Sequence, residues 1–222
     1  MRYLLLLPLL TLLACKPDPQ ADTAAAAANT QLTTAQGKPE PADYKMTGDA
    51  ATDAVIREYV RLDEQYHAGM LQRKDVTYQC GKILGRVELY TEDGKFAMAV
   101  NHYNDGDQRT VTDRWYLKDE APVHFKSESI TWEIQGPMVK QANGMETPGI
   151  RTATNEYRYY IADGKVFKFL KKSYEHFNYR SDNVDPATVA NVPANTNGDI
   201  PARFAIVEAA RETGSVACEL WN

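Results

Sequence analysis

The histidine and acidic side chains of this 222-residue chain fall into no familiar catalytic or metal-binding pattern. There is no G-x-S-x-G nucleophile turn, no G-x-x-x-x-G-K-[ST] phosphate loop and no H-E-x-x-H zinc motif. The four histidines lie on different predicted elements at spacings that match no zinc motif: His67, His102, His124 and His176. The 30 acidic residues supply so many accidental pairs that no glycosidase pair can be chosen. We therefore predict no catalytic, cofactor-binding or metal-binding residue.

The stretch Asn104-Asp105-Gly106-Asp107 places two carboxylates close together, and calcium prefers such oxygen ligands. The stretch lacks the spacing and the terminal glutamate of an EF-hand loop. A turn between two strands accounts for the same residues, because Asn, Asp and Gly are common turn formers. We therefore expect a hairpin turn here rather than a calcium site.

Tyrosine recurs at one position of a repeated hairpin pattern, Y-x-x-D-[GE]-x, as Tyr90, Tyr116 and Tyr160. Two interpretations are open. The rings either pack against neighbouring strands, or they form a contact surface, since tyrosine offers a large contact area at low entropic cost. Lys165 and Lys168 belong to a basic strip beside the third tyrosine, which would attract an acidic partner. These five residues are the candidate partner-binding residues.

The elements that must position these side chains are mostly strands. Asp93-Gly94 and Asp163-Gly164 each separate two β-forming runs, which is the strongest short-range signal of a hairpin. The alternation predicts strands over 76–80, 83–91, 95–103, 108–117, 123–126, 129–134, 156–162 and 165–174, and a loop over 135–153. Periodicity near 3.6 predicts helices over 49–72 and 202–212. The expected fold class is mainly β, an antiparallel meander or small barrel of hairpins with flanking N- and C-terminal helices.

The first 14 residues are distinct from the rest of the chain. Arg2 supplies a positive charge, and residues 4–13 form an apolar run that is too short to span a bilayer, which takes about 20 residues. This is the pattern of a signal peptide. Residues 15–48 are rich in Pro, Ala, Thr and Gln, which predicts a flexible tether. Residues 49–222 are the expected β-rich domain.

The end of the signal peptide, Leu12-Leu13-Ala14-Cys15, resembles the lipobox of bacterial lipoproteins. The resemblance implies cleavage before Cys15, which then carries a diacylglycerol and an N-acyl chain such as palmitate. Several acyl chains together hold a protein durably on a membrane. Lys16 follows the cysteine where inner-membrane retention would favour aspartate, so the implied location is the periplasmic side of the outer membrane. An ordinary cleaved signal with an incidental cysteine is the alternative.

Net charge and cysteine count indicate which partners to expect and whether the chain carries a disulfide. The formal net charge of −5 provides no overall basic surface for phosphates, so we expect no nucleic-acid partner. If Cys15 is lipidated, Cys80 and Cys218 remain, and a pair outside the cytoplasm is most simply bonded. Their wide separation makes the bridge worth on the order of 5 kcal/mol in the chain-entropy model. Two free thiols are the alternative.

Val76-Thr77-Tyr78-Gln79-Cys80, with a second cysteine near the C-terminus, resembles the opening of the membrane-bound inhibitors of C-type lysozyme. The resemblance implies a β-barrel lipoprotein with bonded cysteines. The family's Ser-Ala-Ser-Gly inhibitory loop is missing, so no functional residue is carried over. We expect a lipid-anchored, non-enzymatic binding module with a protein partner in the periplasm, and inhibition of a lysozyme-like cell-wall hydrolase as its concrete form. A structural component of an envelope assembly and a cell-wall glycan hydrolase are the alternatives.

The substitution Cys15→Ser is expected to release the protein from membranes, because it removes the only predicted attachment point for acyl chains. Membrane and soluble fractions of cells expressing each form, probed for the protein, measure the effect. The double variant Cys80→Ser/Cys218→Ser serves as the control and should stay with the membrane. Continued sedimentation of the Cys15→Ser protein with the membrane fraction would count against lipid anchoring.

Overall fold

Eight antiparallel strands form one meandering sheet in the computed structural model, which describes residues 45–195 and 200–221. The elements are α2 (Ala50–His67), β1 (Gln72–Cys80), β2 (Ile83–Glu92), β3 (Lys95–Asn104), β4 (Arg109–Lys118), β5 (Ala121–Ile134), β6 (Val139–Lys140), β7 (Glu146–Thr147), β8 (Ile150–Ala162), β9 (Lys165–Phe177), η2 (Pro186–Thr188), β10 (Val192–Pro193), α3 (Ile200–Thr213) and η3 (Cys218–Trp221). The sheet order is β1-β2-β3-β4-β5-β8-β9-β10, and β6 pairs with β7 separately. The expected fold class is confirmed in its meander form.

The described residues all belong to one compact unit, Pro39–Asn222. The predicted signal peptide, Cys15 and most of the predicted tether lie outside the described residues. Those three predictions therefore stay predictions.

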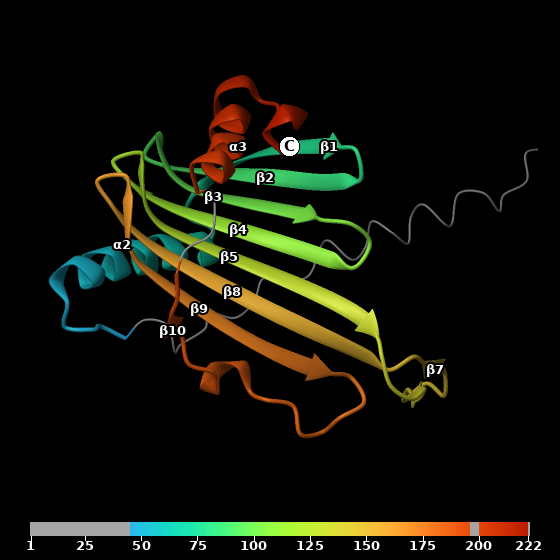
Figure 1. Ribbon diagram of the computed structural model, residues 1–222. Coiled ribbons are helices and arrows are strands. Elements are labelled where there is room, and N and C mark those ends of the chain that lie inside the picture. Colours follow the sequence, from blue (N-terminus) through green and yellow to red (C-terminus); the bar gives the residue numbers. More distant parts are fainter. Residues whose placement is uncertain (1–44, 196–199, 222) are drawn as a thin grey trace, which may run out of the picture. The chain divides into compact units, whose positions relative to one another are not determined.

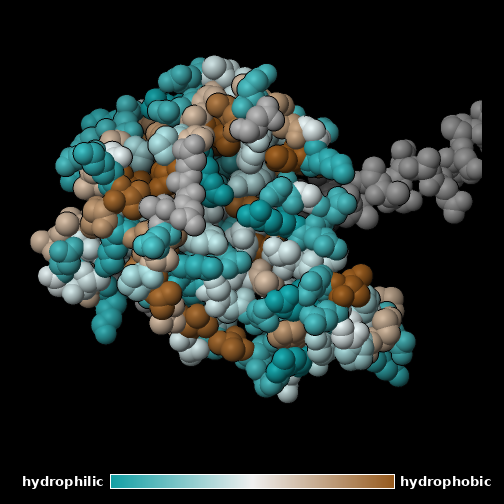
Figure 2. Space-filling view, in the orientation of Figure 1, coloured by the Kyte–Doolittle hydropathy of each residue, from teal (hydrophilic) through white to brown (hydrophobic). Residues whose placement is uncertain are grey.

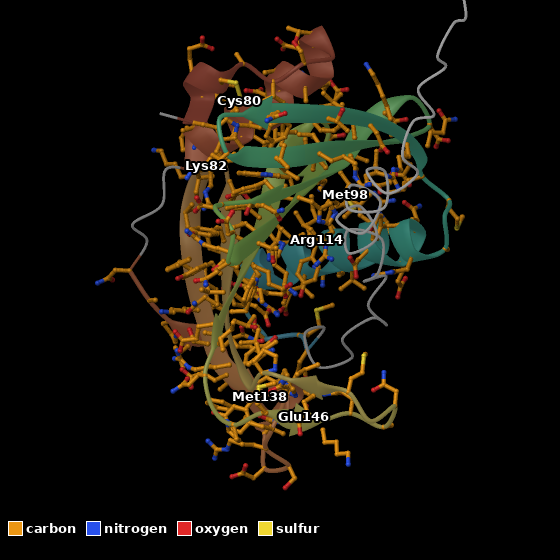
Figure 3. The ribbon with its side chains drawn as sticks, turned by 90° about the vertical axis from the view of Figure 1, so that its right-hand side faces the viewer. Cys80, Lys82, Met98, Arg114, Met138 and Glu146 are labelled. Carbon is orange, nitrogen blue, oxygen red and sulfur yellow. A yellow bond between two sulfur atoms is a disulfide. The ribbon has the colours of Figure 1, made fainter. Side chains whose placement is uncertain are left out.

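The two long helices lie on opposite faces of the sheet, as Figure 1 and Figure 3 show from two directions. On the α3 side, Trp115 and Phe125 stack with ring centroids 3.9 Å apart, and Val207 of α3 is fully buried in the same cluster. On the α2 side, Leu62 and Met98 are fully buried. The sheet is therefore the middle layer between two separate apolar cores.

Helix α2 begins at a capping residue and presents one apolar stripe to the sheet. The Asp49 carboxylate accepts a hydrogen bond from the Thr52 backbone N–H at 2.8 Å, which satisfies an end group of the helix. Its buried apolar residues follow helical spacing: Val55, Ile56, Tyr59 and Leu62. Among the described helices, none combines the length and the apolar character needed to cross a bilayer.

The repeated hairpin pattern corresponds to a repeated structure. Each of the three hairpin turns has positive φ at both central residues: Asp93 and Gly94, Asp119 and Glu120, Asp163 and Gly164. Each hairpin also changes register at the residue after its tyrosine, which marks a β-bulge there. Glu120 has φ of 64° where the other turns have glycine, a region that side-chain-bearing residues adopt only under restraint. The extended β4–β5 pairing supplies that restraint.

The structure extends several strands beyond their predicted limits. β1 begins at Gln72 rather than at 76, because it pairs along its whole length with β2. β5 is continuous where two strands were expected, and β8 starts at Ile150 within the predicted loop. The pairing of Ile134 with Ile150 draws both segments into the sheet. These are long-range contacts, which local sequence preference does not encode.

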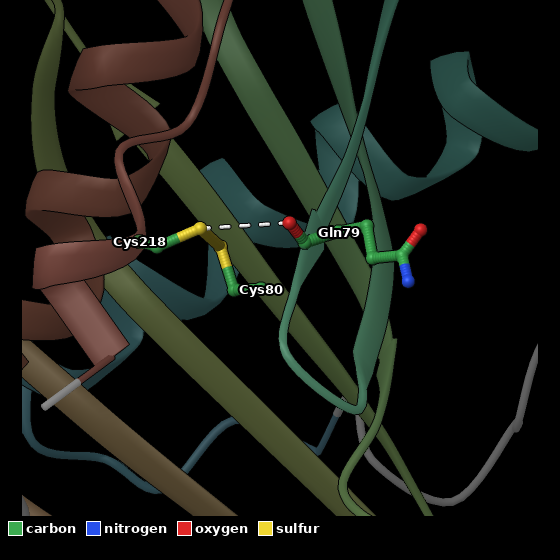
Figure 4. The surroundings of a disulfide bond; sticks show 3 residues. All are labelled: Gln79, Cys80 and Cys218. Carbon is green, nitrogen blue, oxygen red and sulfur yellow. Dashed lines mark hydrogen bonds between the residues drawn. A yellow bond between two sulfur atoms is a disulfide. The ribbon is translucent and has the colours of Figure 1, made fainter.

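A disulfide joins β1 to the last turn of the described chain, and the prediction that Cys80 and Cys218 pair is confirmed (Figure 4). Their Cα atoms are 5.2 Å apart across a sequence separation of 138. Trp221 of the same turn stacks on Tyr78 and meets Tyr103 edge-on, with ring centroids 5.7 and 4.6 Å apart. The bridge and these rings together hold the C-terminal turn against the sheet.

Replacing both cysteines, as Cys80→Ser/Cys218→Ser, is expected to lower the free energy of unfolding by about 2–5 kcal/mol, because the unfolded chain gains freedom. Urea unfolding followed by circular dichroism measures this loss. Intact mass should also rise by about 2 Da on reduction of the native protein, since a bridge takes up two hydrogens. Equal unfolding midpoints, or two alkylatable thiols in the untreated protein, would contradict the bridge.

Candidate functional site

The two sides of the sheet offer a partner different surfaces. Figure 2 looks at the α3 side and shows hydrophilic side chains over most of it, with hydrophobic residues in small, separate areas. Small polar groups on that side form hydrogen bonds with one another. For example, the Ser173 hydroxyl donates to Asn155 Oδ1 at 2.8 Å. The α2 side instead gathers a large set of charged side chains next to the aromatic residues that α2 covers.

The strand register places these charges together. Residues two apart on a strand face the same side, and Arg114 and Lys126 are each two positions from residues that pack beneath α2, Tyr116 and His124. Figure 3 shows Arg114 on the side of the sheet that α2 occupies. The α2-side charged face comprises Arg73, Asp75, Arg86, Glu88, His102, Arg114, Lys126, Glu128, Glu156, Arg158 and Lys172.

Glu88 forms the first centre of this face. Its side chain is almost fully buried, and its carboxylate lies 2.7 Å from Arg86 and 3.0 Å from Arg73. The Tyr90 hydroxyl donates to the same carboxylate at 2.6 Å. Burial and the neighbouring Glu88 charge both raise the pKa of Tyr90, so it stays a hydrogen-bond donor. Two guanidinium groups and a phenol thus surround the Glu88 side chain.

Glu156 forms the second centre and is fully buried. Three cations surround it: Arg158 at 3.0 Å, Lys172 at 3.3 Å and Lys126 at 3.4 Å. Burial alone would raise the pKa of Glu156, but the three positive charges outweigh burial and the pKa is lowered. Among the described residues, the ion pairs of this centre join one carboxylate to three cations.

Arg114 lies between the two centres and differs from the other cations. Among the residues that the structure describes, it has no hydrogen-bond or ion-pair partner, and its Nε is buried without an acceptor. A guanidinium carries five donors in a planar fork that suits carboxylate and phosphate oxygens. Arg114 is therefore a half-buried guanidinium on a central strand without a described hydrogen-bond acceptor, and the described carboxylates whose charges act on it are Glu128 and Asp63.

His102 lies beside Arg114 and is held neutral. Its Nδ1 is 3.1 Å from the Thr112 hydroxyl, and its Nε2 is 3.9 Å from Glu88. Burial lowers the pKa of His102 to about 4, and Arg114, Arg86 and Arg73 act in the same direction, against the opposing effect of Glu88. At neutral pH the ring therefore contributes hydrogen bonding without charge.

The face as a whole is positive although the chain is acidic. Its described residues include six Arg and Lys side chains against four Asp and Glu side chains, while the whole chain has a formal net charge of −5. Such a local reversal of sign attracts anionic groups. The arrangement is suited to holding an anionic group by charge-assisted hydrogen bonds.

The structure places the sequence-predicted tyrosines beneath α2. Tyr90, Tyr116 and Tyr160 are 5%, 3% and 4% exposed, so the packing interpretation describes them and they offer no outer contact surface. The physical reason is that α2 lies over this row of the sheet. Lys165 is exposed at the β8–β9 turn, and the Lys168 ammonium lies 5.4 Å from the centre of the Tyr160 ring. Lys168 therefore lies on the α2 side of the sheet, four residues before Lys172 of the α2-side charged face on β9.

The other candidate groups do not come together as a site. His124 is buried against Tyr59, with ring centroids 4.4 Å apart. Asp105 pairs with Arg109 at 2.7 Å, and Gly106 has φ of 78°, as expected of a turn. In the described ranges, three or more His, Cys, Asp or Glu side chains nowhere gather as a metal site.

Sequence reasoning missed the α2-side charged face, although one local signal was present. Arg86 and Glu88 alternate with the apolar Val87 and Leu89, which marks a strand with one polar side. The sequence does not state which other strands place their charges beside these two, because that depends on register.

Replacing His102 by glutamine is expected to flatten the loss of stability between pH 6.5 and 4. The folded pKa of about 4 lies below the ordinary 6.5, so protons bind the unfolded chain preferentially in this interval. The stabilisation is complete above pH 6.5 and is lost as the pH falls toward 4, by at most about 3 kcal/mol. Urea unfolding at neutral pH and at about pH 4.5 measures it.

His176→Gln is the matched control, because His176 is an exposed histidine on β9 and its replacement should leave the wild-type profile unchanged. An equally steep loss of stability in wild type and His102→Gln would show that the neutral buried ring contributes nothing.

Comparisons of the chain with known protein families, with curated proteins and with solved structures found no match. The resemblances to a lipobox and to the lysozyme inhibitors therefore stay predictions from short stretches of sequence.

Proposed function

We propose that the mature protein is a lipid-anchored, non-enzymatic binding protein of the bacterial envelope. It acts on the periplasmic side of the outer membrane and holds an anionic partner on the α2-side charged face. The observation that carries this proposal is Arg114, a guanidinium without a partner among the described residues, on a face with more cations than acids. A preformed, rigid set of donors on central strands favours binding, because little has to be ordered when a ligand arrives.

The cell address rests on the lipobox-like stretch that ends at Cys15 and on the Cys80–Cys218 bridge. A disulfide of this kind persists in oxidising compartments such as the periplasm. Hydrolase inhibition is the concrete form that the Val76–Cys80 resemblance suggests, and the bonded cysteine pair favours it. Glycan hydrolases use pairs of carboxylates, which a positive face could contact.

Capture from periplasmic extract tests the proposal with three forms of the mature chain, each carrying Cys15→Ser so that it stays in solution. The otherwise unchanged form and Arg180→Gln should retain the same partner, and Arg114→Gln should lose most of it. Arg180 is the matched control, because it is an exposed arginine paired with Asp182 and outside the charged face. Retention should weaken as salt is raised, since exposed charges are then screened.

The outcomes separate the alternatives. A captured muramidase whose activity falls on addition of the protein supports inhibition, and a captured multiprotein envelope complex supports a role in assembly. Equal capture by all three forms would contradict binding through this face. Turnover of peptidoglycan by the purified protein, abolished by a single acid-to-amide change, would overturn the binding function altogether.

A further inference from the structure

Strand β1 lies at one edge of the sheet, because β2 is its only neighbour among the described strands (Figure 1). Along an antiparallel strand, every second residue directs its backbone N–H and C=O groups toward the neighbouring strand, and the residues between direct theirs away. Cys80 flanks the two-residue turn to β2 and so bonds to Ile83. The backbone groups of Arg73, Asp75 and Thr77 therefore point outward from the sheet.

The outward groups of these three residues are open. Arg73, Asp75 and Thr77 are exposed, and none of the described residues hydrogen-bonds to their outward N–H or C=O groups. The far end of β1 is closed, since the Gln79 carbonyl oxygen faces Cys218 Sγ at 3.5 Å (Figure 4). The disulfide at this end also holds β1 in place, so little ordering is needed when a further strand is added. An open edge of this kind can take an extended peptide as that strand.

Lys74 gives this edge a chemical preference. It is exposed and has no carboxylate partner among the described residues, whereas the Arg73 guanidinium donates to the Asp75 carboxylate at 2.6 Å. Lys74 lies between two outward residues, so an added antiparallel strand would face it in a non-hydrogen-bonded pair, where opposing side chains come closest. An acidic side chain opposite Lys74 is therefore favoured, and a purely apolar strand is not.

A cavity adjoins the same part of the edge on the α3 side. It has a volume of about 550 Å³, and its lining includes Gln72 and Lys74 of β1 and Arg211 of α3. Leu89 and Phe96, which belong to the α3-side core, also line it. Because Gln72 and Lys74 are residues of the edge strand itself, an apolar side chain opposite Gln72 on an added strand can enter this cavity.

A second copy of β1 fits this edge less well than a foreign segment. Two identical strands pair antiparallel about a two-fold axis, which places one residue opposite itself. With the axis at Arg73, Lys74 or Asp75, like charges would oppose each other. An axis nearer the other end of β1 would bring the second strand against η3, which already lies beside Gln79.

We infer that the open edge of β1 binds an extended, acidic segment of a partner protein, which adds to the sheet as an antiparallel strand. The segment places an acidic residue opposite Lys74 and apolar residues opposite Gln72 and Val76, on the same side of the strand. Backbone hydrogen bonds to the outward residues supply affinity, and the charge of Lys74 and the cavity supply selectivity. This inference goes beyond the proposed function, since it does not use Arg114.

Amide hydrogen exchange, resolved residue by residue by NMR, tests the inference on the mature Cys15→Ser chain. The probe is the hexapeptide Thr-Val-Thr-Glu-Thr-Leu, blocked at both ends so that its termini carry no charge. When its first residue lies opposite Thr77, its glutamate falls opposite Lys74 and its leucine opposite Gln72.

The exchange pattern reports where the peptide pairs. The amides of Arg73, Asp75 and Thr77 should exchange rapidly in the free protein and about tenfold or more slowly with saturating peptide. The amides of Lys74 and Val76 should be slow in both states, because they already bond to β2. Slowing confined to the outward residues would show a strand added at this edge.

Methylated peptides separate backbone pairing from side-chain contact. N-methylation of the third residue, whose N–H faces Asp75, should abolish binding because it removes a backbone donor at the junction of the strands. N-methylation of the glutamate should weaken binding far less, since that N–H points away from β1.

Charge variants test the preference for an acidic segment. Lys74→Glu should weaken binding about tenfold, because an attraction becomes a repulsion, and a peptide with lysine in place of glutamate should restore it. Lys140→Glu is the matched control, because Lys140 is an exposed lysine on the separate β6–β7 hairpin. Both variants change exposed side chains, and circular dichroism verifies that each keeps its fold. Equal affinity for the parent and the Lys74→Glu protein would contradict the acidic character of the segment.

The remaining outcomes distinguish this inference from the proposed function. Arg114→Gln should leave peptide binding unchanged, so each proposal can fail while the other stands. Unchanged exchange of the outward amides at the highest soluble peptide concentration, or equal affinity of the two methylated peptides, would overturn the inference. Slow exchange of these amides before peptide is added would also overturn it. Slow exchange that is lost on dilution would assign the edge to a second copy, and slow exchange that persists would assign it to the chain itself.

Discussion

The two-residue alternation of an antiparallel sheet is the constraint on which the rest of this structure depends. Arg114 and Trp115 are adjacent in sequence, yet one lies on the charged side beside α2 and the other is fully buried beneath α3. A shift of one residue in the β3–β4–β5 register would exchange them, placing a guanidinium in an apolar core. The cost of that exchange fixes the register, and the fixed register in turn brings charges from six strands to one face.

Burial of so much charge opposes stability, and ion pairs and a hydrogen bond offset part of this cost. Glu88 and Glu156 each neutralise part of the positive charge around them, and Tyr90 adds a hydrogen bond to the first. Buried ion pairs of this kind seldom stabilise a fold beyond what apolar residues would achieve. Their presence across the middle of the sheet is consistent with the binding function proposed above.

Local sequence patterns predicted the hairpins, both flanking helices and the cysteine pair, because each depends on neighbouring residues or on simple counting. The hairpins at Asp93-Gly94 and Asp163-Gly164 could be predicted from the preference of tight turns for Asp-Gly, because both residues adopt positive φ there. The exposure of Tyr90 could not be predicted in the same way, since it depends on where α2 crosses the sheet. The surroundings of Arg114 could not be predicted from the sequence for a similar reason, because its neighbours Val100 and Lys126 come from other strands.

The α3 side of the sheet holds the strands together independently of the charges on the α2 side. On the α3 side, the Trp115–Phe125 stack, the packing of α3 and the Cys80–Cys218 bridge hold the strands together without using the α2-side charges. Register, once fixed from that side, holds Arg114 in position even though no described residue satisfies it. A side chain with an unmet hydrogen bond persists in a fold only when the surrounding structure determines its place. The packing and the disulfide on the α3 side thus fix the strand that carries Arg114, whose Nε has no described acceptor.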